Sequence, residues 1–188
     1  MENKSKYQKQ VFGLLMDAFD NETIVNNICK RLNQMGFFDA PASTKYHGSY
    51  PGGLVEHSLN VTNALLALRG EWNGCSWHHP RSPIVVGLFH DLCKCDQYKM
   101  TIGVGGSPAT IEYRTNMMLK GHGDKSVMLA STLLQLTEEE VLCIRYHMGA
   151  FCEKEEWSDY TRAIHKYPAV LMTHTADMIA AHITEVKK

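Results

Sequence analysis

The amino-acid sequence predicts an all-α fold with one small β-hairpin insertion. Apolar residues recur at the 3.6-residue period of one-faced helices over most of the chain, and helix-capping residues stand where several of these stretches begin. Strand-like alternation is confined to residues 98–115. The chain has 188 residues, 44% of them hydrophobic. This suffices for one core, so we expect a single domain over residues 1–188.

The first 36 residues predict a pair of helices. Apolar side chains fall at positions 7, 11, 14, 15 and 18, and again at positions 24, 25, 28, 32 and 35. We expect Gly36 to end the second helix. Residues 37–53 contain two prolines and three glycines, which predicts a loop that leads into a third helix ending near Gly70.

The rest of the chain predicts a central helix, the hairpin and further helices. Ser82-Pro83 has the form of an N-cap followed by proline, and the helix it opens, up to about Lys94, is apolar on nearly every side. Such a helix is expected in the interior. A capping box begins at Thr137, and Pro168 suits the first turn of a last helix that runs to about Val186.

Composition excludes several classes of protein. The formal charge of −1 excludes a strongly basic nucleic-acid arm and a polyacidic tail. No apolar run approaches the roughly 20 residues that cross a bilayer, and the polar N-terminus does not resemble a signal peptide. We therefore expect a cytoplasmic protein without membrane contact. The six cysteines are scattered, and we expect reduced thiols rather than disulfides.

Three polar residues stand at helix positions that the pattern predicts to be buried: His57, Asp91 and Asp177. A lone buried histidine is often a hydrogen-bonded core residue, but an unpaired buried carboxylate is costly. No Lys or Arg lies on the predicted faces, so a divalent cation is the simplest neutralising partner. His122 and His147 stand at helix ends, where histidines also serve as caps or interact with the helix dipole.

The full ordered set resembles the HD superfamily of metal-dependent phosphohydrolases, which is named for its adjacent His-Asp pair. The residues that carry the resemblance are His57, His90-Asp91, His122, His147 and Asp177. The stretch from Gly52 to His57 is especially similar to the HD domain of the YhaM-type 3′-5′ exoribonucleases. The resemblance covers residues 48–182. It implies an HD-domain helical bundle, with a helical pair over residues 1–36 and a metal-site core over residues 48–186.

The resemblance also implies roles for these side chains. One divalent ion would be held by His57, His90, Asp91 and Asp177. Asp91 would bridge to a second ion held by His122 and His147. One or two ions per chain are expected, and Mn, Fe, Zn, Mg, Ni and Co all remain open.

Two further residues are candidates for contact with substrate. Lys94 matches the lysine that follows many HD pairs, and the resemblance implies that it faces a substrate phosphate and serves catalysis with Asp91. The alternative is a solvated lysine at a helix end. Arg145, which stands two residues before His147, is a second candidate for substrate contact, with a plain surface position as its alternative. Cys93 replaces the glycine that is commoner before the lysine.

The implied function is hydrolysis of a phosphoester of a nucleotide or similar small phosphorylated molecule by a metal-activated water. One alternative is a 3′-5′ nuclease acting on single-stranded nucleic acid, and another is a non-catalytic sensor domain that binds metal and a nucleotide. The intact ligand set and Lys94 favour catalysis over the sensor. The 19 basic residues are dispersed among 20 acidic ones, which favours a small substrate over a strand. The oligomeric state stays open.

Overall fold

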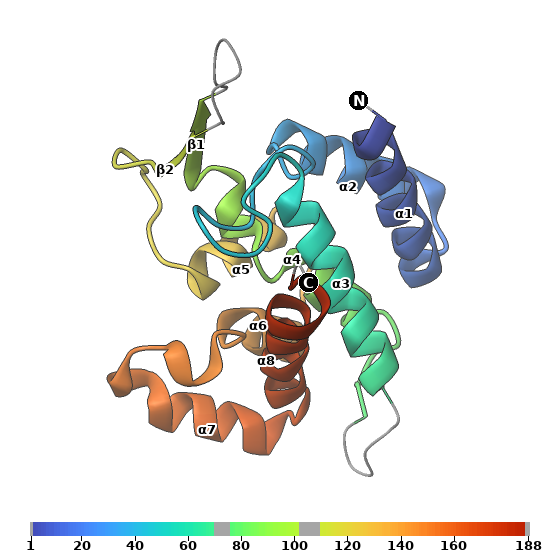
Figure 1. Cartoon of the computed structure of the whole chain (residues 1–188). Coiled ribbons are helices and arrows are strands. Elements are labelled where there is room, and N and C mark those ends of the chain that lie inside the picture. Colours follow the sequence, from blue (N-terminus) through green and yellow to red (C-terminus); the bar gives the residue numbers. More distant parts are fainter. Residues whose placement is uncertain (1, 70–75, 102–109, 187–188) are drawn as a thin grey trace.

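The computed structural model describes residues 2–69, 76–101 and 110–186, which form a mostly helical structure with one antiparallel hairpin (Figure 1). This confirms the predicted fold class. The helices are α1 (Glu2–Phe19), α2 (Glu22–Gln34), α3 (Gly53–Leu68), α4 (Ser82–Phe89), α5 (Gly123–Ser131), α6 (Glu138–Arg145), α7 (Trp157–Lys166) and α8 (Ala169–Ile179). The strands are β1 (Tyr98–Thr101) and β2 (Thr110–Tyr113). Short 3₁₀ turns span Leu92–Cys95, Gly149–Phe151 and Lys154–Glu156, and a π-helical turn spans Ala180–Thr184.

Local sequence signals act at several helix ends as predicted. Thr137 and Glu140 form a reciprocal capping box at the start of α6. Gly36 follows the end of α2 with a φ of +83°, a backbone conformation that glycine adopts without strain. The last helix is shorter than predicted, because α8 ends at Ile179 and a π-helical turn carries the chain onward.

Helix α4 lies in the interior as predicted, but both of its ends differ from the prediction. Ser82 is not the N-cap, because it is the first helical residue and its hydroxyl donates to the buried carboxylate of Glu140 at 3.0 Å. The α-helix ends at Phe89 instead of continuing to Lys94. The following turn is fixed by another helix, since the backbone N–H of Cys93 donates to the hydroxyl of Ser126 in α5 at 3.1 Å.

Close packing of α4 against its neighbours decides where polar side chains meet. All eight residues of α4 are buried, and the helix packs against α1, α3, α5 and α6. A Cβ atom at Gly87 would lie 2.4 Å from the hydroxyl oxygen of Thr62 in α3. Only glycine therefore allows α3 and α4 to approach this closely, and the approach brings His57 of α3 near His90 at the end of α4.

The hairpin projects from the helical body (Figure 1). Tyr98 pairs with Tyr113, and Met100 pairs with Ile111. The predicted turn between the strands lies outside the described residues. Across the three described ranges, no helix is both long enough and apolar enough to cross a membrane. Five cysteines in these ranges are free thiols, and Cys75 lies outside them.

Candidate metal centre

The structure brings all six predicted metal ligands together from five parts of the chain. They are His57 in α3, His90 and Asp91 directly after α4, His122 at the N-cap of α5, His147 just after α6, and Asp177 in α8. A Cβ atom at Gly123 would lie 2.0 Å from the carbonyl oxygen of Arg145. The glycine thus lets the start of α5 press against the end of α6, which places His122 beside His147.

Four of these residues form what we call the inner half of the cluster: His57, His90, Asp177 and the Oδ2 atom of Asp91. The Nε2 atom of His57 lies 3.0 Å from Asp177 Oδ1, 3.4 Å from His90 Nε2 and 3.7 Å from Asp91 Oδ2. His90 Nε2 lies 3.5 Å from the same Asp91 oxygen. His57, His90 and Asp91 are almost fully buried, and the side chain of Asp177 is 18% exposed.

The other oxygen of Asp91 belongs to what we call the outer half, together with His122 and His147. Asp91 Oδ1 lies 3.0 Å from His122 Nε2 and 3.5 Å from His147 Nε2. The two Nε2 atoms are 3.1 Å apart. One carboxylate therefore faces two groups of nitrogen atoms, one with each oxygen.

Hydrogen bonds on the far side of each ring fix which nitrogen points into the cluster. The Nδ1 atoms of His90 and His147 donate to the carbonyl oxygens of Gly87 and Ile144 at 2.9 and 2.7 Å. A carbonyl only accepts, so Nδ1 must carry the hydrogen and the neutral ring keeps its lone pair at Nε2.

The remaining two rings have different partners. His57 Nδ1 lies 3.0 Å from the carboxylate of Glu185, which also accepts from the side chain of Asn60 at 2.9 Å. His122 Nδ1 lies 3.3 Å from the thiol sulfur of Cys93. The carboxylate fixes the orientation of His57 more strongly than the thiol fixes that of His122, because sulfur is a weak hydrogen-bonding atom.

This donor set fits a divalent cation. Asp91 Oδ1 is buried and accepts no well-formed hydrogen bond from any described residue. It faces two imidazole nitrogens, and lone pairs directed at one another repel unless a cation or proton lies between them. Neutral imidazoles and ionised carboxylates are the usual ligands of Zn, Mn, Fe and related ions.

The charges of the buried groups reflect this crowding. Burial opposes ionisation of Asp91, but Lys94 and the neighbouring imidazoles hold its pKa well below the usual range. Burial also disfavours the protonated form of His57, yet hydrogen bonds to Asp177 and Glu185 outweigh it and raise the pKa of His57 to about 9. Burial lowers the pKa of His90. The carboxylates thus favour positive charge on His57 and Lys94, whereas burial favours the neutral form of His90.

Lys94 lies beside Asp91, contrary to the prediction. The prediction that no Lys or Arg neutralises the buried acids is wrong for Asp91, because Lys94 Nζ lies 2.6 Å from Asp91 Oδ2. The two residues are three positions apart, a spacing that brings side chains together within one helical turn, so this ion pair is local. Lys94 is mostly buried, with 12% of its side chain exposed, and it lines the cavity beside the cluster.

Arg145 does not line this cavity. Its guanidinium pairs with Asp124 at 2.6 Å and with Glu156 at 2.7 Å, and it lies 4.5 Å from the ring centre of Tyr146. The side chain is therefore engaged in contacts between α5, α6 and the turn before α7. Its position gives no support to the predicted contact with substrate.

A cavity of about 330 Å³ opens onto the cluster. Its wall includes Asp91, Lys94, His122, His147 and Asp177. A second cavity of about 850 Å³, which we call the outer cavity, shares residues with the first. The shared wall residues are His47, Met148, Phe151, Ala181 and His182.

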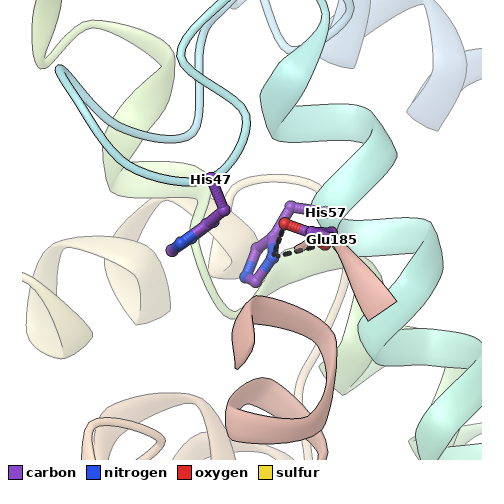
Figure 2. A group of neighbouring side chains, drawn as sticks. All are labelled: His47, His57 and Glu185. Carbon is purple, nitrogen blue, oxygen red and sulfur yellow. Dashed lines mark hydrogen bonds and ion pairs between the residues drawn. The ribbon is translucent and has the colours of Figure 1, made fainter. Parts of the chain in front are cut away.

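Sequence reasoning missed two residues next to the inner half, His47 and Glu185. With His57 they form a further group whose ligand atoms lie within 4.8 Å of one another, and Figure 2 shows the three side chains together. His47 stands in a Gly- and Pro-rich loop, five residues before Gly52. This short distance in sequence from the motif could have identified it as a neighbour of the cluster. Glu185 carries no signal, since it sits among polar residues near the end of the chain.

No family model matches this sequence, and no curated protein or solved structure matches it either. The resemblance to the HD superfamily therefore rests on the motif residues, with which the buried His/Asp cluster is compatible.

Proposed function

We propose that this chain is a metal-dependent phosphohydrolase that acts on a phosphoester of a nucleotide or similar small phosphorylated molecule. The observation that carries the proposal is that the two carboxylate oxygens of Asp91 face separate groups of imidazole nitrogens, at distances of 3.0 to 3.7 Å. The residues that would hold divalent ions are those of the inner and outer halves. When bound there, such ions supply a Lewis acid and lower the pKa of water.

The chain's own residues would bind and orient the substrate. Lys94 lines the cavity and now contacts Asp91 Oδ2. Once that oxygen has another positive partner, the ammonium group would be available to a phosphate oxygen, to which it offers donors and a point charge. Asp91 and three of the four imidazoles are buried, and the exclusion of bulk water strengthens the electrostatic interactions at the site.

The charge around the cavities supports a small substrate. Among the described residues that line either cavity, Lys94 and Lys45 are the two Lys or Arg side chains. Lys125, near in sequence to the motif, is instead buried against Asp96. A protein that binds several backbone phosphates needs more cationic side chains. The logarithm of its affinity for single strands falls with the logarithm of the salt concentration, with a slope of about −0.7 per contacted phosphate.

The test is metal analysis of the purified protein, followed by phosphate-release assays on nucleotides, cyclic nucleotides and short oligonucleotides. We expect bound divalent metal and release from at least one small substrate. The matched control is His165→Ala, which alters an exposed histidine in α7. Absence of both metal and turnover would refute the proposal. A large preference for oligonucleotides that collapses with salt would replace it with the nuclease.

Lys94 provides a second test. We expect Lys94→Ala to keep its metal content, because an ammonium group has no lone pair for a metal. We also expect kcat/KM to fall by roughly tenfold or more, as for loss of a charge-assisted hydrogen bond. Unchanged kcat/KM across good substrates would show that Lys94 serves only as the counter-charge of Asp91.

A further inference from the structure

His47 lies against the inner half, and the proposed metal ligation leaves it without a role. It stands in the loop between α2 and α3, and its ring lies beside that of His57, with ring centres 4.8 Å apart and planes tilted by 34° (Figure 2). The contact fixes the position of His47 relative to a proposed ligand.

The loop that carries His47 is held by its own hydrogen bonds. The hydroxyl of Ser43 donates to the carbonyl of His47 at 2.8 Å and accepts from the backbone N–H of Tyr46 at 2.9 Å. The N–H of Ala42 donates to the carbonyl of Gly48 at 2.9 Å. The backbone on both sides of His47 is thus fixed, and the imidazole is presented from a defined support.

One atom of this ring lacks a partner. His47 Nε2 is shielded from solvent and makes no hydrogen bond to any described residue. Buried polar atoms in native proteins are nearly always satisfied, so an unmatched one calls for a ligand or water. His47 lines both the metal-facing cavity and the outer cavity, so a molecule that fills the first would meet this ring where the two join.

Ligation of another metal ion explains this atom less well. An ion shared by His47, His57 and Glu185 would have to break the hydrogen bond between His57 Nδ1 and Glu185 at 3.0 Å. The other nitrogen of His57 already faces Asp177 and His90. A hydrogen bond from His47 to a substrate leaves all these contacts in place.

We infer that His47 is a substrate-binding residue that donates a ring N–H to a phosphate oxygen at the junction of the two cavities. The inference rests on the proposed function for the identity of the substrate as a phosphoester. In either protonation state the ring carries at least one N–H. Lys94 lines the same cavity as His47 and would donate to the same phosphate, so the anion would receive two donors besides any bound ions.

The test measures binding of inorganic phosphate to the metal-loaded protein by calorimetry, with metal content determined in parallel. We expect His47→Ala to raise the Kd for phosphate by roughly tenfold or more, as for loss of a hydrogen bond to a charged group. Metal content should stay unchanged. His47→Gln, whose amide keeps N–H donors, should restore most of the affinity. His165→Ala is the matched control.

Three results would overturn the inference: equal phosphate affinity in His47→Ala and wild type, loss of metal in His47→Ala, or no phosphate binding by wild type. Failure of the proposed function would give a different experimental result. In that case phosphate binding would still depend on His47, while wild type would hydrolyse no phosphoester.

Discussion

Each half of the buried cluster contains two imidazoles, but the halves differ in charge and in the groups that support the rings. The inner half has two carboxylates, Asp91 and Asp177, whereas the outer half has Asp91 alone. Glu185 stands behind His57 in the inner half, while the thiol of Cys93 stands behind His122 in the outer half. The side chain of His122 is 29% exposed and that of His57 is 1% exposed.

Two sites with the same number of histidines need not bind a metal ion equally tightly. Carboxylates attract a cation directly, and an anionic partner behind an imidazole makes that imidazole a better ligand. Burial strengthens each of these interactions. We therefore expect a divalent ion to bind the inner half more tightly than the outer half.

The largest effect is expected from Asp91→Asn, which removes the charge that both halves share. Asparagine has nearly the same shape, so the fold should persist while both ions are lost and phosphate release falls to background. Metal analysis after gel filtration measures the loss, and circular dichroism checks the fold. Stoichiometric metal in this variant would show that Asp91 is not a ligand.

A smaller effect should separate the two halves. We expect His122→Ala to lose one ion and most activity while the inner ion stays, and His57→Ala to release the inner ion. Metal-to-protein ratios after dialysis against a weak chelator distinguish the variants. The order of affinities is reversed if His122→Ala releases the tighter ion.

Glu185→Gln should weaken only the inner half. Glutamine keeps the size of the side chain but loses the charge that orients His57, and loss of such a partner typically lowers metal affinity by roughly 10- to 100-fold. Titration with metal in a competing chelator measures the change. Glu155→Gln, an exposed site before α7, is the matched control. Equal affinities in the two variants would deny Glu185 any part in positioning His57.

The smallest effect is expected from Cys93→Ala. Burial raises the pKa of the Cys93 thiol to about 12, so the group is neutral and interacts weakly with His122. We expect the affinity of the outer half to fall by less than roughly tenfold, with the inner half unchanged. Cys29→Ala in α2 is the control. If Cys93→Ala lowered metal affinity as much as Glu185→Gln, the thiol behind His122 would matter as much as the carboxylate behind His57, and the proposed difference between the halves would be wrong.

Sequence pattern alone predicted the helical class, the buried α4, the hairpin segment and the capping box at Thr137. These features are local, because helical periodicity, caps and turns depend on residues within a few positions of each other. The same periodicity identified His57, Asp91 and Asp177 as polar residues on apolar faces, and the ordered motif added His90, His122 and His147.

Only the tertiary structure decided which partners surround these residues. Glu185 reaches His57 across 128 positions of sequence, and a loop places His47 on the same ring. The α-helix ends at Phe89, and in the turn that follows the backbone N–H of Cys93 donates to Ser126 of α5. Arg145 was drawn to Asp124 and Glu156 instead of the cavity. Such contacts depend on how separate elements pack, and packing is set by close approaches such as Gly87 on Thr62 that no local pattern encodes.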